Sequence, residues 1–476
     1  MWRQLAIVSV VWVVAYLTPI GLFEFRGEEP RRVLPALEML DRGEYLIPRI
    51  GGQPYFQKPP LINWLVAGSF MLFGTRIEWT ARLPSALFIL VVAVVLVTST
   101  RSMLGAKGSM IASLSWLTNF GMLEQGQTIE IEPVYISLLA LALISWLLCW
   151  QQRRSPWLMW LVPSVFLGVG LLAKGPAHLL FFYVLVGAVL WQSGRLREFL
   201  HPAHFVAIII MWAIFAAWAV PYVMELESLR AIGAKSFWED FYFFFSGEEV
   251  TPENWRLNFP KGLAYFLPWA LLLPFVRVNK IADARQRAVI RGFAWGTVPL
   301  AMMMLLPPGS FPRYILPLLP AFCWGLGLIY ANDAFEWRVA ISRLQVKVSK
   351  RTVIAIVIVC AAGSAIGFPI RAATYLRNRE RISPIAAKIN AVMPAGERLY
   401  AIDPYFQAFL VYVHAPITYL TSVDKLPADA RYVLIHTKDR PKIERSRRWR
   451  ACRPRVIEWT PRYRGQSAML FEMQAR

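Results

Sequence analysis

Long apolar runs recur along this chain, and they limit what it can fold into. Runs of about 17 to 22 residues match the roughly 30 Å hydrocarbon thickness of a bilayer at about 1.5 Å per helical residue. Hydrophobic residues make up 57% of the 476 residues and charged residues only 17%, outside the usual range of soluble domains. The sequence therefore predicts an all-α, polytopic membrane bundle.

About eleven spanning helices are expected. They cover residues 5–23, 82–99, 108–122, 132–150, 156–173, 176–191, 204–221, 261–276, 292–306, 314–331 and 352–370. The first run is too long for the apolar core of a secretory signal, so we expect it to be retained. The apolar stretch 61–74 is too short to span and predicts an interfacial or re-entrant helix.

The segments between these spans alternate in charge. Basic segments lie on one side, which the positive-inside rule makes the cytoplasm: they lie around Arg101, Arg153 and Arg195 and over 277–291 and 338–351. Most of the unusual polar residues fall on the opposite side, in segments 24–61, 123–131, 222–260 and 307–313 and the turn at Lys174. We expect an inner-membrane protein whose active site faces the periplasm or the exterior. The net charge of +21 is explained by topology and anionic lipid, and no nucleic-acid partner is predicted.

Hydropathy falls after about residue 371. Short alternating runs at 398–403, 431–437 and 468–473 flank a helical stretch at 384–393. Such a pattern is typical of a small α/β domain. We therefore divide the chain into a transmembrane domain, 1–371, whose catalytic outer loops are 24–61 and 222–260, and an extracytoplasmic domain, 372–476.

An acidic cluster follows the first span, at residues 23–32. Carboxylates at a membrane boundary are costly to place, which favours a chemical role. We interpret Glu28 as the catalytic base. The structural alternative is a surface ion pair between Glu28 and Arg31 or Arg32.

Several motifs occur in a consistent order. They are Gly27-Glu-Glu-Pro-Arg31, Tyr55-Phe-Gln-Lys-Pro-Pro-Leu61, Ala81-Arg-Leu-Pro-Ser85, Glu132-Pro133, Leu172-Ala-Lys-Gly-Pro176 and Pro312-Arg-Tyr314. Over roughly residues 1–370 this set resembles the polyprenyl-phosphate-sugar-dependent glycosyltransferases, which include lipid A aminoarabinose transferases and protein mannosyltransferases. The resemblance implies the C-type glycosyltransferase fold, with an active site at the outer face of the bundle.

The same resemblance implies a reaction and its partners. A polyprenyl-phosphate-linked sugar would be transferred, with inversion at the anomeric carbon, to lipid A, another glycan or lipid, or a protein. Glu132 joins Glu28 as a catalytic candidate, although an acid there also favours the positive end of a helix. Basic and aromatic side chains would hold the phosphate and the sugar. The predicted substrate-binding residues are Glu29, Arg31, Tyr55, Lys58, Arg82, Lys174, Arg313 and Tyr314.

Two departures from the family pattern bear on the chemistry. The family typically has Asp at the positions of Glu28 and Glu132, so each carboxylate here extends one methylene further. Gln57 stands where the family often has Glu, which removes a metal ligand. No cofactor is predicted with certainty, and a bound divalent cation stays an open alternative. The cysteines and histidines show no metal-binding spacing.

Two other classes of protein fit the composition. A polytopic transporter or flippase of an envelope precursor would also need many spans, although its charges usually lie near the midplane on repeated halves. A non-catalytic scaffold would work through its outer domain. Within the enzyme reading, the aromatic and acidic segment 222–260 predicts a mobile lid that excludes water, or else an amphipathic interfacial segment.

Overall fold

The computed structural model describes residues 1–55, 58–230, 252–307, 310–341, 344–379, 381–404, 407–451, 454–459 and 467–473. The chain forms two compact units. The first comprises Met1–Leu22, Gln57–Ile62 and Arg82–Thr374, and the second comprises Phe23–Phe56, Asn63–Ala81 and Tyr375–Arg476. The domain boundary placed at residue 371 stays a prediction, and the second unit as observed also takes in two N-terminal stretches.

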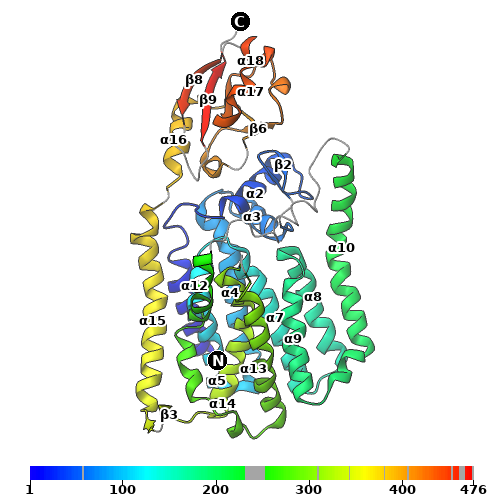
Figure 1. Ribbon diagram of the computed structural model, residues 1–476, viewed down its shortest axis with the longest axis vertical. Helices are drawn as coiled ribbons and strands as arrows, with labels where there is room; N and C mark the ends of the chain where they lie inside the picture. The colour runs from blue at the N-terminus through cyan, green and yellow to red at the C-terminus, as the bar shows by residue number, and fades with distance from the viewer. Residues whose placement is uncertain are drawn as a thin grey trace. The chain divides into compact units, whose positions relative to one another are not determined.

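The first unit is a bundle of apolar helices that lie side by side (Figure 1). Its elements are α1 (Trp2–Trp12), the π-helical turn η1 (Val13–Leu17), α4 (Glu78–Thr98), α5 (Arg101–Thr118), α6 (Phe120–Gln125), α7 (Ile131–Gln151), α8 (Pro156–Lys174), α9 (Ala177–Gln192), η2 (Leu196–Leu200), α10 (Pro202–Arg230), α12 (Pro252–Ala264), η3 (Trp269–Phe275), η4 (Val278–Lys280), α13 (Ala284–Leu305), η5 (Pro312–Leu318), α14 (Leu319–Ala331), the hairpin β3 (Arg338–Ile341) and β4 (Leu344–Lys347), and α15 (Lys350–Thr374). The helix α7 is buried along nearly its whole length and packs along α8, while α8 packs along α10.

Seven of the described helices are long and apolar enough to cross a membrane, and three shorter apolar helices accompany them. The protein is therefore a multi-pass membrane protein, as predicted, although the count of eleven is not confirmed. The span predicted at 261–276 is wrong. The helix α12 ends at Ala264, and η3 is a 3-10 helix. Pro268 and Pro274 cause this break, because proline lacks the amide hydrogen that a continuous helix needs.

The second unit is an α/β assembly. It contains α2 (Pro30–Arg42), the hairpin β1 (Arg49–Ile50) and β2 (Gln53–Pro54), most of α3 (Leu61–Phe73), η6 (Leu376–Asn378), α16 (Ser383–Val392), β5 (Leu399–Ile402), η7 (Ala408–Tyr412), β6 (Ile417–Leu420), η8 (Val423–Lys425), β7 (Tyr432–His436), η9 (Thr437–Asp439), α17 (Arg440–Ile443), α18 (Arg447–Ala451), β8 (Pro454–Trp459) and β9 (Ala468–Met473). The predicted strands at 398–403, 431–437 and 468–473 and the predicted helix at 384–393 are confirmed as β5, β7, β9 and α16.

One mixed sheet organises this unit, with strand order β6-β5-β7-β9-β8. The strands β6, β5 and β7 run parallel, and β9 pairs antiparallel with both β7 and β8. All five residues of β7 are buried, as expected for a strand covered on both faces. Trp449 packs edge-on against Phe471 of β9, with ring centroids 4.9 Å apart, and so closes one side of the core.

Candidate functional site

A carboxylate shared by two cations lies in the first unit. Lys174 donates a hydrogen bond from Nζ to Glu132 Oε1 at 2.7 Å, and Arg313 Nε lies 3.3 Å from the same oxygen. The Glu132 side chain is 5% exposed, against 16% for Lys174 and 29% for Arg313. We call these three residues, with Tyr135 and Tyr314, the Glu132 cluster.

Helix ends place the two innermost charges of the cluster. Glu132 lies in the first turn of α7 and Lys174 in the last turn of α8, where the helix dipoles favour an anion and a cation respectively. The helix α8 stops at Gly175, whose φ of +83° is a conformation that glycine adopts without strain. The Lys-Gly-Pro motif therefore ends the helix just after the lysine.

Aromatic rings line the cations. The Lys174 ammonium lies 4.9 Å from the ring centroid of Tyr314 and 5.5 Å from that of Tyr135. The Arg313 guanidinium lies 5.0 Å from the ring of Phe311. These cation–π contacts restrict both basic side chains without neutralising them.

The charges of the cluster do not cancel. One carboxylate faces two cations, so the sum is one positive charge. An ionised carboxylate that accepts a hydrogen bond from Lys174 and forms an ion pair with Arg313 is a poor proton acceptor. The geometry therefore suits a positioning role better than a proton transfer, because Glu132 holds Lys174 and Arg313 close together.

Two residues beside the cluster escaped the sequence analysis. The Tyr265 hydroxyl is hydrogen-bonded to the Glu124 carboxylate, and burial, followed by that carboxylate, raises the pKa of Tyr265. The charges of Arg313 and Glu132 also act on the pKa of Tyr265. Tyr265 falls inside the predicted membrane span 261–276, so it was not considered as a candidate.

Other predicted residues belong to the second unit. Arg31 Nη1 lies 3.3 Å from Glu28 Oε2, one helical turn away, and both side chains are about one-third exposed. Glu29 is buried and accepts a hydrogen bond from the Arg26 amide at 3.0 Å, which closes the turn before α2. The Arg32 guanidinium donates to the Tyr55 hydroxyl at 3.0 Å.

Lys58 and Arg82 belong to the first unit. Lys58 is half-buried. Arg82 is fully buried and donates to the Ile20 carbonyl at 2.9 Å, so it joins α4 to the segment that follows η1. Four of the predicted residues therefore meet in one cluster, namely Glu132, Lys174, Arg313 and Tyr314.

Comparisons with known proteins agree with this architecture. Residues 57–220 match the family model described as dolichyl-phosphate-mannose-protein mannosyltransferase. The crystal structure of ArnT from Cupriavidus metallidurans bound to undecaprenyl phosphate superimposes with a TM-score of 0.73 at 18% identity, over 98% of this chain and 97% of that one. The apo form of the same enzyme gives a TM-score of 0.69 at 17% identity, over 99% and 97%. The chain has the C-type glycosyltransferase fold.

Curated relatives are similar over a shorter stretch. The undecaprenyl phosphate-alpha-4-amino-4-deoxy-L-arabinose arabinosyl transferase 2 of Pseudomonas fluorescens is 28% identical over 349 residues, which is 70% of this chain and 58% of the relative. The transferase of that name from Pseudomonas savastanoi is 29% identical, over 70% and 62%. The matched stretch thus spans about three fifths of these relatives. The predicted resemblance to the polyprenyl-phosphate-sugar-dependent glycosyltransferases is confirmed.

Two further predictions concern a metal and a lid. No group of three or more His, Cys, Asp or Glu side chains that could hold a metal occurs within the described ranges. Gln57, at the position where the family often has a ligand, lies outside them. The centre of the predicted lid, residues 231–251, also lies outside the described residues.

Proposed function

We propose that this protein is a membrane glycosyltransferase that moves a sugar from a polyprenyl-phosphate donor to an acceptor of the cell envelope. The observation that carries the proposal is the Glu132 cluster, in which one buried carboxylate holds Lys174 and Arg313 close together. Fold and family-model similarity to transferases supports it, and favours an enzyme over the transporter alternative.

The chemistry of the donor matches the charge of the cluster. As the anomeric carbon leaves the phosphate, negative charge grows on the phosphate oxygens, and cations fixed beside them lower the barrier. Lys174 supplies a compact ammonium and Arg313 a fork that can bind two oxygens. Tyr314 would then contact the phosphate or the sugar.

The transfer itself needs a base. In the proposed step, an acceptor hydroxyl attacks the anomeric carbon from the side opposite the phosphate. The new carbon–oxygen bond forms as the old one breaks, the electron pair leaves with the phosphate, and the hydroxyl proton passes to the Glu28 carboxylate. Configuration at the anomeric carbon is inverted. Glu28 is partly exposed, which keeps its carboxylate accessible to an acceptor.

The sugar and the acceptor are finer points of the proposal. The names of the relatives support a 4-amino-4-deoxy-L-arabinose donor on undecaprenyl phosphate, and the resemblance of the motifs to lipid A aminoarabinose transferases adds lipid A as the acceptor. The matched family model instead supports a mannosyl donor and a protein acceptor. We favour the first pair, because those alignments cover about twice as much of the chain. An inner-membrane location with the site facing the periplasm follows from the distribution of basic segments.

The test uses the purified full chain in detergent. It is incubated separately with undecaprenyl-phosphate aminoarabinose and with a polyprenyl-phosphate mannose, each with lipid A, and release of polyprenyl phosphate is followed. Mass spectrometry of lipid A then reports an added aminopentose or hexose. Donor-dependent release with a matching mass gain supports the proposal, and no consumption of either donor would refute it.

A further inference from the structure

The second unit contains a cavity, and none of the residues that line it belongs to the Glu132 cluster. Its volume is about 780 Å³, within the ~300–1,000 Å³ range of small-molecule sites. We call it the α2–β6 cavity. It is lined by residues of α2, by Arg76 and Arg398, and by most of the segment 410–419, which includes Ala415.

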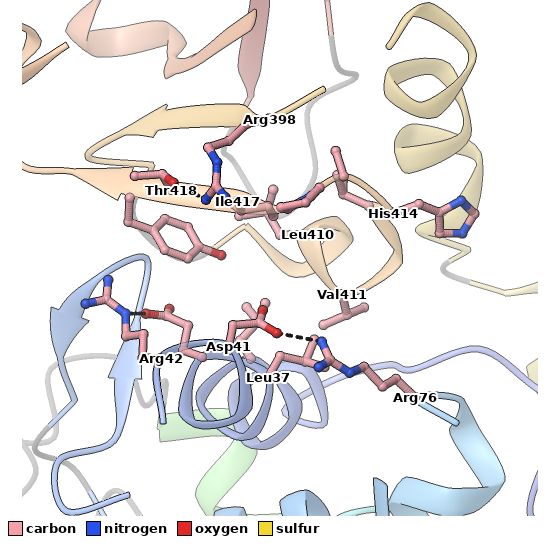
Figure 2. Close-up of a pocket in the computed structure, with 16 residues that line it drawn as sticks. Leu37, Asp41, Arg42, Arg76, Arg398, Leu410, Val411, His414, Ile417 and Thr418 are labelled. Carbon is pink, nitrogen blue, oxygen red and sulfur yellow. Dashed lines mark hydrogen bonds and ion pairs between the residues drawn. The ribbon is translucent and has the colours of Figure 1, made fainter. Parts of the chain in front are cut away.

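Two opposed walls form the cavity, as Figure 2 shows. Leu37, Asp41 and Arg42 come from α2 on one side. Residues of η7 and β6, with Arg398 just before β5, form the other. The turn between β1 and β2 packs tightly against the wall formed by β6, because a side-chain carbon added at Gly52 would meet the Tyr419 Cβ at 2.5 Å.

Three arginines give the cavity its charge. Arg76 donates to Asp41 at 2.8 Å, and Arg42 lies 3.7 Å from Glu38. Arg398 donates to the hydroxyl of Thr418 at 2.8 Å and makes no ion pair within the described part of the chain. Two acids therefore face three arginines.

Burial also reduces the negative charge that Glu38 contributes to the cavity. It raises the pKa of Glu38 to about 7, against the opposing effects of the Gly52 amide and Arg42. A substantial fraction of this carboxyl is thus protonated near neutral pH, and His414 adds a further basic group to the lining. The cavity carries a net positive charge that a bound anion would neutralise.

The rest of the lining is mixed. Leu34, Leu37, Val411 and Ile417 provide an apolar wall, while Thr418, Tyr419 and the charged side chains provide hydrogen-bonding groups. A sugar ring presents both an apolar carbon–hydrogen face and a rim of hydroxyls, so it suits such a surface better than a purely apolar ligand does. A phosphate attached to the ring would suit the arginines.

We propose that the α2–β6 cavity is a binding site for a phosphorylated sugar, with Arg398 and Arg76 as its phosphate-binding side chains. The proposal does not depend on the transferase activity. The ligand could be a free sugar phosphate or the headgroup of a glycolipid, since both present the same chemistry.

The first test measures binding to the purified full chain by calorimetry. The probes are glucose 6-phosphate, glucose, glycerol 3-phosphate and inorganic phosphate. We expect glucose 6-phosphate to bind more tightly than the other three. If glycerol 3-phosphate or inorganic phosphate binds as tightly, the sugar assignment is overturned, and if no phosphorylated probe binds, the site itself is overturned.

Matched variants locate the site. Arg398→Gln removes the arginine that makes no ion pair with a described residue, and it should weaken glucose 6-phosphate binding about tenfold. Arg450→Gln makes the same change of charge at an exposed residue of α18, outside the cavity lining, and should leave affinity unchanged. Equal affinities for the two variants would contradict the proposal.

A third variant fills the space without changing charge. Ala415→Trp should abolish glucose 6-phosphate binding while the unfolding temperature stays near that of the wild type. Retained binding in this folded variant would overturn the assignment. A phosphorylated glucosamine glycolipid in detergent distinguishes the two sources of ligand. If the wild-type chain binds the glycolipid and Ala415→Trp does not, the ligand is a glycolipid headgroup. If the wild-type chain binds glucose 6-phosphate but not the glycolipid, the ligand is a free sugar phosphate.

Discussion

The Glu132 cluster and the α2–β6 cavity both place acids beside cations, but they differ in how many cations share one acid and in how much space lies between the charged groups. In the cluster, a single carboxylate oxygen lies within 3.3 Å of both Lys174 and Arg313. In the cavity, whose volume is about 780 Å³, each acid has its own arginine, and a third arginine, Arg398, donates to the hydroxyl of Thr418 on its own wall. The first arrangement fixes two cations for one anionic group, and the second leaves room for a whole small molecule.

This comparison predicts that Glu132→Gln has the largest effect on folding. The substitution keeps the size of the side chain but leaves two cations side by side without an acid. Breaking a buried ion pair typically costs about 3–5 kcal/mol, so we expect a clear fall in unfolding temperature in detergent. Glu132→Asp, which keeps the charge, should be milder. If Glu132→Gln unfolds at the wild-type temperature, Glu132 does not position the cations.

The next effect concerns activity. Lys174→Met removes the innermost cation of the cluster and should lower the rate of donor consumption by roughly 10²–10³-fold, the usual loss when one fixed electrostatic contact to a transition state is removed. Lys107→Met, on an exposed position of α5, is the matched control and should retain the wild-type rate. Equal rates for the two variants would remove the cluster from the proposed reaction.

The cavity makes a pH prediction through Glu38. Its pKa rises from an ordinary value of 4.5 to about 7 in the folded chain. Between these values the folded state binds more protons than the unfolded state, so stability falls as pH rises, by at most ~3 kcal/mol. The pKa of Glu24 shifts downward, so its effect appears only in more acidic solution.

Thermal unfolding between pH 5 and pH 8 checks this expectation. The glutamine of Glu38→Gln cannot ionise. As pH rises, the unfolding temperature of this variant should therefore increase relative to that of the wild type. Glu44→Gln, at a side chain 58% exposed, provides the control. A difference that stays constant across the range would show that Glu38 is already ionised at pH 5.

The two regions also differ in how far the sequence could predict them. Short motifs and the alternation of the loops indicate Glu132, Lys174 and Arg313. Helix ends hold Glu132 and Lys174, and Arg313 lies in the 3-10 helix η5. Tyr265 was missed because hydropathy alone assigned its segment to a span. Hydropathy does not register how Pro268 and Pro274 interrupt the helical hydrogen bonds.

The α2–β6 cavity could not be predicted at all. Its walls come from residues near 40, 76, 398 and 410–419, and no local pattern encodes contacts across such separations. Strands with strong alternation, β7 and β9, were found. The short edge strand β6, which carries Thr418 and Tyr419, was missed because four residues of mixed polarity give little periodic signal.

The smallest expected effect tests how the cavity wall is built. Gly52 has a φ of +77°, and a carbon added there would lie 2.5 Å from the Tyr419 Cβ. Gly52→Ala should therefore destabilise the chain by about 1–3 kcal/mol and weaken glucose 6-phosphate binding, because Tyr419 must move. Gly43→Ala, at a φ of +72° with no atom within 4 Å, carries the same backbone strain without the contact. If both variants lose stability but only Gly52→Ala loses glucose 6-phosphate binding, the loss of binding comes from the contact with Tyr419 and not from backbone strain. If both variants bind glucose 6-phosphate equally well, this edge of the cavity does not shape the ligand site.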